Sequence, residues 1–472
     1  MTTRHLVLVD EPIPFFAIAA LLALGAAVAI IFQPLYVLIA LTALTAVFIF
    51  TLKPEWGIIG LILTFPLLGV RLQFGAPGGL TTLFPDGINL PISDVIGLLV
   101  LTAWIVRWVV QWDKRPVRAP LMVTFALFLL TGALSLINHP EPILGLKYLV
   151  RPITFVYLVF FFVPMNVLWS RQSVLRVMRV VFWWAALIAC VSAVIGFLKI
   201  LDGSFARIAP PIIGTFAPLG MNWNLLAEFL VPVVPIGIFL ERHARTKFEQ
   251  RIVVLATLLI VGAAALTFAR SAWIALAFSA IVLLAHVRSR IATFGMTALL
   301  VLAVVAPAFV GLIVFSGSYA AESSLAARTV LTGIAGQAFR DEPLIGRGVG
   351  MFEDIVASTK YFGIEYGDPL DAHGVIQKVA AEQGIFGLLA LGLLVGALLL
   401  PLLQALRHTR GEEQFAARCA LAMMVSALVY QLFNTSYYAG KLWLPLGIGY
   451  ALFLAFIPPR YAREHRPHHS HA

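Results

Sequence analysis

The sequence predicts an all-α, polytopic membrane protein. Of its 472 residues, 61% are hydrophobic and only 12% are charged, whereas an ordinary soluble domain is about half apolar and about a quarter charged. A soluble globule cannot hide so much apolar surface from water, so soluble enzymes, nucleic-acid-binding proteins and disordered scaffolds are excluded. The apolar residues are gathered in many long runs, which is typical of helices that cross a bilayer.

These runs predict about 12 to 14 transmembrane helices of about 20 residues each. Several runs are shorter than a full span, so we expect tilted helices or local thinning of the bilayer. The third run is short and the first two lie close together, which leaves the lower counts open. In chain order the apolar segments are Phe15–Phe32, Leu35–Leu52, Trp56–Val70, Val95–Trp112, Pro120–Ile137, Val150–Trp169, Val180–Leu201, Asn224–Leu240, Ile252–Phe268, Ala272–Ala285, Ile291–Phe315, Gly384–Leu406, Ala416–Phe433 and Leu442–Ile457.

Basic residues predict the orientation of these helices. If the N-terminus is cytoplasmic, the inner loops include the most basic segments, among them DKRPVR, ERHARTKFEQR and the C-terminal tail. Lys and Arg collect on the cytoplasmic side of membrane proteins, so we expect both termini in the cytoplasm. The net charge of +10 is then mainly an orientation signal, and no nucleic-acid partner is expected.

The chain reads as a single integral membrane domain over residues 1–472, with three outer stretches long enough to form structure. These are Arg71–Asp94, Asp202–Trp223 and a last one that begins at Ser316. Residues 316–381 are the largest of them and are predicted to form a helical extracytoplasmic loop.

Two helices are expected in this loop. Ser323 or Ser324 can cap a helix that continues to about Phe339, where the sequence DEP breaks it. A second helix is predicted to start near Asp371 and to run into the next span. Between them, Gly346, Gly348 and Gly350 predict a flexible turn rather than a nucleotide-binding loop, since no Lys-Ser/Thr follows.

Arginines on the outer side are the first unusual feature. They lie at span ends or in outer loops, and they are Arg151, Arg207, Arg270, Arg328, Arg340 and Arg347. Arginine near the membrane is costly and usually has an anionic partner, and its planar fork suits phosphate. For any one of them, snorkelling or pairing with a nearby carboxylate is the simpler interpretation. For Arg207 and Arg270 together we favour an anion site.

The second unusual feature is GDPLDAHGVIQKVAAEQG, which holds the only histidine of residues 316–381. The imidazole of His373 can take a proton from a sugar hydroxyl, and Asp371 is near enough in sequence to orient the ring. The plainer alternative is an Asp371 that caps a helix and a histidine on its surface. The spacing D-x-x-D-x-H lacks further carboxylates, so no metal site is expected.

Asn224 and Glu228 lie one turn apart on one face of a predicted span. Polar residues of this kind either hold helices together or line a polar cavity. The sequence leaves both interpretations open.

Four separated motifs together resemble the bacterial O-antigen ligase and O-antigen polymerase superfamily. Arg207 followed by GTFAPLGMNWNLLAEFL resembles its R…G-x-F…N-x-L-A segment, with Asn224 at the Asn. TFARSAW resembles its T-x-S-R-(G/S)-(A/S) turn, with Arg270 at the Arg. Arg328 followed by DEPLIGRGVGMF resembles R…P-x-x-G-x-G-x-G-x-F. DAHGVIQKVAAEQGIFGLLA resembles H-N-x-x-(L/I)-Q…E-x-G-x-x-G, with His373 at the His.

The order and spacing of these motifs agree over Arg207–Ala390, and the flanking spans agree only in character. Two residues depart from the pattern. Ala269 replaces the usual Ser before Arg270, and Gly374 replaces the usual Asn after His373. The second departure removes a polar group that would help to hold an acceptor.

The resemblance implies a GT-C-like glycosyltransferase of the bacterial inner membrane that needs no metal or other cofactor. Its donor would be an undecaprenyl-diphosphate-linked glycan, and its acceptor a glycan or a lipid-linked hydroxyl on the periplasmic face. We expect His373 to be the base and Arg207 and Arg270 to bind the diphosphate. Arg328, Arg347, Asn224 and Asp371 are expected to assist in substrate binding.

Within this family a polymerase is slightly favoured over an O-antigen ligase, because the chain is somewhat long and has no extended terminal domain. The alternative from another class is a multi-span lipid or polysaccharide transporter or flippase. Transporters tend to show inverted repeats and broken helices near the midplane, whereas the polar motifs here gather on one outer face.

Overall fold

The computed structural model describes residues 34–67, 69–74, 88–110, 115–203, 207–212, 217–285, 319–435 and 439–457. Almost all of them are helical, as predicted. The helices of the first half are α2 (Pro34–Leu52), α3 (Pro54–Thr64), α4 (Ile92–Val109), α5 (Met122–Ser135), η1 (Leu136–Asn138), α6 (Pro142–Tyr148), η2 (Leu149–Phe155), η3 (Leu158–Phe162), α7 (Val163–Val167) and α8 (Arg171–Leu201). The helices of the second half are α9 (Trp223–Leu230), η4 (Val231–Val233), α10 (Val234–Arg242), α11 (Lys247–Leu266), α12 (Arg270–Leu284), α14 (Tyr319–Asp341), α15 (Phe352–Ala357), α16 (Lys360–Tyr366), α17 (Val375–His408), α18 (Gly411–Gln431) and α19 (Gly440–Phe456).

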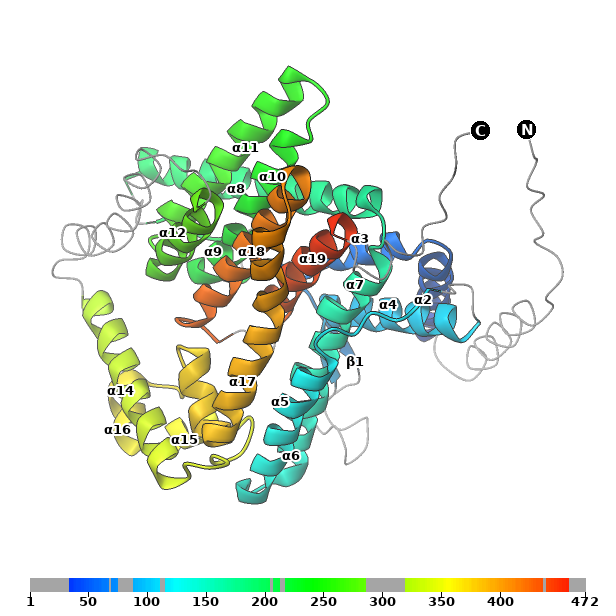
Figure 1. The fold of residues 1–472 in the computed structure, drawn as a ribbon. Helices are drawn as coiled ribbons and strands as arrows, with labels where there is room; N and C mark the ends of the chain where they lie inside the picture. Colours follow the sequence, from blue (N-terminus) through cyan, green and yellow to red (C-terminus); the bar gives the residue numbers. More distant parts are fainter. Residues whose placement is uncertain are drawn as a thin grey trace.

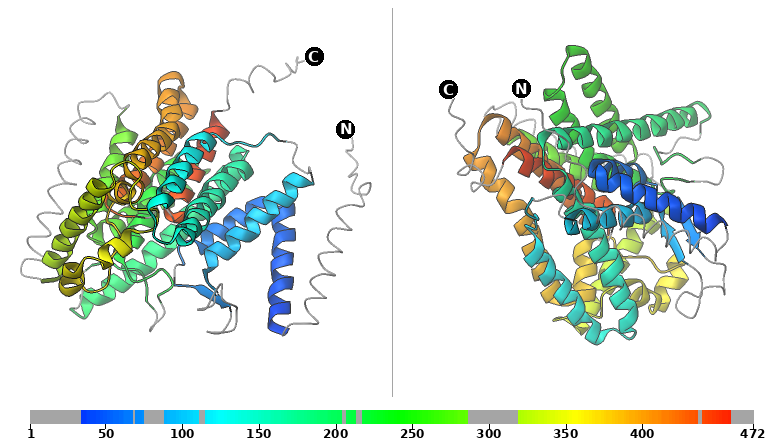
Figure 2. Two further views of the ribbon diagram at one scale, coloured as in Figure 1. Left: turned by 90° about the horizontal axis from the view of Figure 1, so that it is seen from below. Right: turned by 90° about the vertical axis from the view of Figure 1, so that its right-hand side faces the viewer.

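The predicted spans agree with these helices. Each apolar segment that lies in the described residues corresponds to one helix or to a run of consecutive helices, whereas Phe15–Phe32 and Ile291–Phe315 lie outside them. Six helical segments of the described residues are long and apolar enough to cross a membrane, and shorter apolar helices accompany them. Most helices share one oblique direction in the left view of Figure 2, which is the arrangement of a bundle of spans.

Local signals set several helix ends. Ser170 accepts a hydrogen bond from the backbone N–H of Ser173 at 3.0 Å and so caps α8. Thr246 caps α11 in the same way through the N–H of Glu249, whose carboxylate in turn accepts the N–H of Arg245. These side chains satisfy donors that the first turn of a helix leaves open.

One predicted outer stretch contains a short hairpin rather than only loop. Strands β1 (Arg71–Phe74) and β2 (Ile88–Pro91) pair antiparallel, with Arg71 opposite Pro91. Residues between them lie outside the described part of the chain. The hairpin leads directly into α4.

Residues 319–381 of the predicted loop form a small helical unit (Figure 1), and this unit has its own apolar core. Helix α14 is already under way at Tyr319, so Ser323 and Ser324 lie inside it and are not its cap; it ends at Asp341, as predicted. The buried core residues of this unit are Ala327, Leu331, Ala335, Ala338, Phe352, Val356, Phe362, Ala372 and Ala381. The unit packs on the first part of α17.

Helix α17 joins this unit to the bundle and is bent where the two meet. Gly384 has φ 64°, and a Cβ atom there would lie 2.6 Å from the carbonyl of Leu344. Only glycine tolerates this conformation and this close approach. The first turns of α17 therefore belong to the small helical unit, and the rest of the helix belongs to the bundle.

Candidate active site

The predicted arginine turn is formed by TFARSAW, between α11 and α12. Thr267 is buried, and its hydroxyl donates to the carbonyl of Ala264 at 2.7 Å and accepts the N–H of Ala269 at 3.2 Å. Phe268 has φ 55° and is the one described residue other than glycine with a positive φ. Such strain persists where the surroundings fix it, often at functional sites. The turn makes Arg270 the first residue of α12, with an exposed side chain.

Arg328 approaches the same place from α14. Burial and the charge of Arg270 lower its pKa from the ordinary value, although a guanidinium remains protonated over the usual pH range. Its Nε atom is buried and has no hydrogen-bond partner among the described residues. Neither Arg270 nor Arg328 forms an ion pair with a described carboxylate. Two like charges close together without a counter-ion favour the binding of an anion.

His373 lies beside Arg328, just before α17. Burial and the charge of Arg328 lower the pKa of its imidazole, and the charge of Asp371 acts in the opposite direction. The lowered pKa favours the neutral form of the ring. A neutral imidazole can accept a proton, which is what a general base requires.

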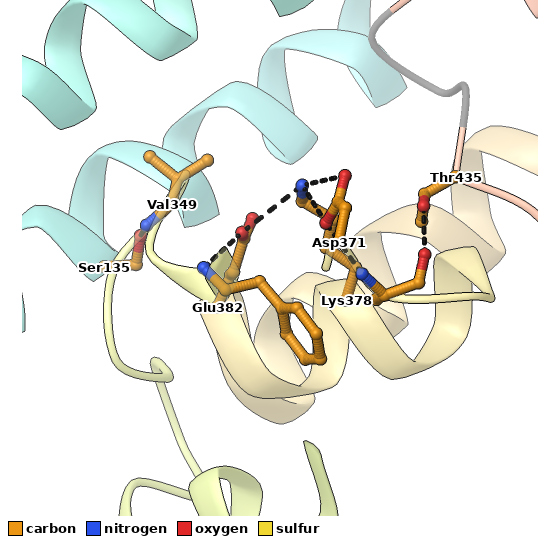
Figure 3. Close-up of polar contacts among 8 residues, drawn as sticks. Ser135, Val349, Asp371, Lys378, Glu382 and Thr435 are labelled. Carbon is orange, nitrogen blue, oxygen red and sulfur yellow. Dashed lines mark hydrogen bonds and ion pairs between the residues drawn. The ribbon is translucent and has the colours of Figure 1, made fainter. Parts of the chain in front are cut away.

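Asp371 has a different partner from the one that its position in the sequence indicates (Figure 3). Both of its carboxylate oxygens accept hydrogen bonds from Nζ of Lys378, at 2.6 and 2.8 Å. Lys378 also lies 3.8 Å from Glu382, which accepts the backbone N–H of Phe352 at 3.1 Å. Asp371 thus acts on His373 through its charge and fixes the start of α17 through a buried lysine.

The backbone around His373 is held by the segment that directly follows α18. The hydroxyl of Thr435 donates to the carbonyl of Ala372 (Figure 3). On the other side of the histidine, a Cβ atom added to Gly374 would lie 2.8 Å from the carbonyl oxygen of Leu432. The glycine at this departure from the family pattern thus allows the chain to pack closely on the end of α18. An asparagine there would require the two segments to separate.

A buried polar cluster supports this end of α18. Glu228 on α9 accepts hydrogen bonds from Gln431 at 2.8 Å and from Asn434 at 3.0 Å, and Nζ of Lys441 lies 3.7 Å away. Next to it, the phenol of Tyr430 donates to the backbone carbonyl of Asn224 at 2.7 Å. Of the two interpretations of Asn224 and Glu228, the contacts of Glu228 fit the one in which polar groups hold helices together.

The Tyr430 contacts connect the cluster to the arginine turn. The hydroxyl of Ser271, the residue after Arg270, interacts with the Tyr430 phenol, and the charge of Arg328 acts on it. The ends of α9, α12 and α18 thus meet at the place where α14 brings Arg328.

Arg207 lies on the α9 side of this assembly. Its guanidinium stacks on the ring of Trp223, with 3.9 Å between Cζ and the ring centroid. Burial lowers its pKa from the ordinary value. Trp223 begins α9 and precedes Asn224, so the stacking holds Arg207 beside the Asn224–Tyr430 contact.

Arg347 is held elsewhere. Its guanidinium forms an ion pair with Asp341 at 2.7 Å, and its backbone N–H donates to the carbonyl of Ala381. The glycines around it form a tightly packed turn and not a flexible one: φ is positive at Gly346, Gly348 and Gly350, and added Cβ atoms would meet neighbours at 3.0 Å or less. Arg347 therefore belongs to the small helical unit, whereas the charge of Arg328 acts on His373.

The sequence alone did not single out Tyr430, Thr435 or Lys441 for this site. All three are polar groups at the ends of apolar segments, and such residues usually mark functional positions in membrane proteins. That signal was present in the sequence QLFNTS and in the lysine that opens the last span. Their partners, however, lie far away along the chain.

Comparison with known families fits this geometry. Residues 255–392 match a family model described as O-antigen ligase. This part of the chain is similar to the O-antigen ligase family. The O-antigen ligase segment contains Arg270, Arg328, Asp371 and His373, and it leaves Arg207 outside. Activity of the O-antigen ligase or polymerase type follows, with a lipid-linked glycan as substrate and a membrane as location. No curated protein matches the chain.

Proposed function

We propose that the protein transfers a glycan from undecaprenyl diphosphate to a sugar hydroxyl on the periplasmic face of a bacterial inner membrane. The observation that carries the proposal is the meeting of three groups from three segments. Arg270 begins α12, Arg328 projects from α14 and His373 precedes α17. The charge of Arg270 acts on Arg328, and the charge of Arg328 acts on His373. The two arginines supply positive charge without a described counter-ion, and the histidine supplies a neutral base.

The proposed reaction is a direct displacement at the anomeric carbon. The imidazole of His373 takes the proton of the acceptor hydroxyl, and the acceptor oxygen forms a bond to C1 of the donor sugar. The bond between C1 and the diphosphate oxygen breaks, so undecaprenyl diphosphate leaves with the electron pair. Arg270, Arg328 and Arg207 stabilise the negative charge that develops on the leaving group, which is the main electrostatic task of the site.

An apolar cavity of about 430 Å³ supports the proposal of a lipid-linked substrate. It begins at Val375 and Ile376, two residues after His373, and continues along α17 to Leu398 and Leu399. Side chains of α5, α18 and α19 complete its walls. A cavity of this composition suits a polyprenyl chain whose diphosphate lies at the arginines.

Metal independence is part of the proposal because of the leaving group. A diphosphate is already a good leaving group, and guanidinium groups can neutralise its charge. Both termini are proposed to be cytoplasmic, which places the loop with His373 on the periplasmic side. A reporter fused within that loop tests the orientation, and a cytoplasmic signal would contradict it.

A polymerase is still favoured slightly over a ligase. Deletion of the gene and electrophoresis of the surface glycans distinguish the two. Glycans of a single repeat unit indicate that a polymerase has been lost, whereas long chains that remain on the carrier indicate a lost ligase. Unchanged glycan together with a defect in lipid export would favour the transporter.

The base is tested by the variant His373→Ala. We expect a loss of at least about 10²-fold in the rate of transfer by the purified protein, since general bases contribute 10² to 10⁴. Size-exclusion chromatography checks that the variant remains folded. A folded variant with full activity would refute the assignment.

A further inference from the structure

A lysine is buried close to the segment that carries His373. Lys378 lies in the first turn of α17, and its side chain is only 4% exposed. Both carboxylate oxygens of Asp371 accept hydrogen bonds from its Nζ, at 2.6 and 2.8 Å, and Glu382 lies 3.8 Å away on the next turn. Figure 3 shows the lysine nitrogen between the two carboxylates. Lys378 is thus the centre of a buried row of three charges.

Stability alone does not account for this row. Transfer of charges from water to a protein interior is costly, and apolar residues of similar volume often replace a buried ion pair without loss of stability. Apolar packing is available here, because Ala372, Val375 and Val379 of the same segment are buried. A lysine at this position therefore points to a task beyond packing.

Other elements also place titratable groups near Lys378. The charges of Asp371 and Lys378 act in opposite directions on Glu353 of α15, and the ring of Tyr148 from α6 lies 5.5 Å from the lysine nitrogen. Glu382 has a second partner, the backbone N–H of Phe352 at 3.1 Å. The short contacts at both of its oxygens make Asp371 the closer of the two carboxylates in the row.

The charge of Asp371 reaches the imidazole of His373, two residues further along the chain. Burial lowers the pKa of this imidazole, the charge of Arg328 lowers it further, and the charge of Asp371 raises it. Arg270 on α12 and the phenol of Tyr430 on α18 act in turn on Arg328. A cation that offsets the charge of Asp371 therefore favours the neutral ring, which is the form that a general base requires.

We propose that Lys378 is a positioning residue for the base: it binds both oxygens of Asp371 and offsets the charge of this carboxylate, so that the imidazole of His373 stays free to take a proton. Charges act more strongly in a buried site than in water. Other contacts of Asp371 do not change the sign of the effect, because loss of the ammonium group always makes the potential at the ring more negative. The inference rests on the proposed function, in which His373 is the base.

The first test measures the ionisation of His373 without any glycan transfer. Diethyl pyrocarbonate acylates an imidazole only in its unprotonated form, and mass spectrometry after digestion of the treated full chain follows His373 separately from the other histidines. The midpoint of the reaction rate against pH gives the pKa. In Lys378→Met this midpoint should rise by about 1 pH unit, the lower end of the effect of a nearby charge.

Replacement of the other partner should have the opposite sign. In Asp371→Asn the negative charge is lost and the lysine remains, so the midpoint should fall. In Lys378→Met/Asp371→Asn both charges are absent, and the midpoint should return close to that of the wild type. The matched control is Lys360→Met, an exposed lysine at the start of α16, which should leave the midpoint unchanged. A lysine with a purely structural role predicts one midpoint for all folded variants.

A midpoint in Lys378→Met at or below that of the wild type would overturn the proposal. If this variant does not fold, as judged by size-exclusion chromatography, Asp371→Asn decides: a lower midpoint supports the proposal, and an unchanged or higher one overturns it.

Glycan transfer by the same variants separates this inference from the proposed function. The acidic limb of kcat/KM against pH should move together with the midpoint. If the midpoints move as expected and the limb does not, the charge of Lys378 controls His373 as inferred, and it is the assignment of His373 as the base that fails.

Discussion

Substitution of Arg328 is the most informative test of the site. Its guanidinium is expected to bind the diphosphate of the donor and also to lower the pKa of the base, His373. In Arg328→Gln the diphosphate loses a guanidinium whose Nε is buried and has no described partner. Removal of one donor to a developing oxyanion typically costs about 10² to 10³ in kcat. We therefore expect a decrease of this size in the rate of glycan transfer from a purified polyprenyl diphosphate donor.

The same variant should change the pH dependence. The charge of Arg328 lowers the pKa of His373, so its removal raises that pKa. A base acts in its unprotonated form, which is present above its pKa. The acidic limb of the profile of kcat/KM against pH should therefore move to higher pH in Arg328→Gln. In Arg328→Lys the limb should stay near its original position, because the charge is kept, while the rate still falls with the loss of the bidentate fork.

Arg340→Gln is the matched control for both measurements. Arg340 is exposed in the last turn of the same helix. Its removal should change neither the rate of glycan transfer nor the pH of the acidic limb of kcat/KM. If Arg328→Gln transfers glycan at the rate of the wild type with an unmoved acidic limb, the placement of Arg328 between donor and base is wrong. If Arg328→Lys shifts the limb as much as Arg328→Gln, the effect does not come from charge.

Three further predictions concern the arginine turn, the glycine beside the base and metal ions. Arg270→Lys should lose most of the transfer activity, because an ammonium group cannot reproduce the two hydrogen bonds of the fork; equal activity would argue against a diphosphate clamp. Gly374→Ala should lower the free energy of unfolding by about 1 to 3 kcal/mol through overpacking against Leu432, as measured by thermal or denaturant unfolding. Gly396→Ala on the same helix, where an added Cβ meets nothing within 4 Å, should be neutral or stabilising. A chelator should leave the rate unchanged, and a strict requirement for a divalent ion would contradict the metal-independent reaction.

The spans were predictable because a long apolar run has few alternatives. In a bilayer every backbone polar group needs an internal partner, and helices provide it locally. The same reasoning did not find β1 and β2, because RLQF and INLP are short and their pairing joins residues on either side of a loop. Helix ends were predicted less well: α17 begins at Val375 and not at Asp371, with Gly374 as its cap.

The residues of the candidate site were predictable only where a single sequence motif contains the functional side chain. Arg270 and His373 are recognisable from their own sequence surroundings, and the fold brings both to the same end of the bundle. Arg328 is expected from the sequence only to assist in substrate binding. Its place next to His373 depends on which face α14 turns toward the bundle, and packing decides that. The contacts of Glu228 join helices about 200 residues apart, a relation that no local pattern contains.

The separate core of α14 to α16 has a consequence for how the two guanidinium groups are held. Arg270 is fixed by the bundle, whereas Arg328 is fixed by a unit with its own interior. The two guanidinium groups repel each other across the interface between the α14–α16 unit and the helix bundle. An anion that binds between them also holds the unit against the bundle. Binding of the anion and closer packing of the unit on the bundle are then coupled, so that each favours the other.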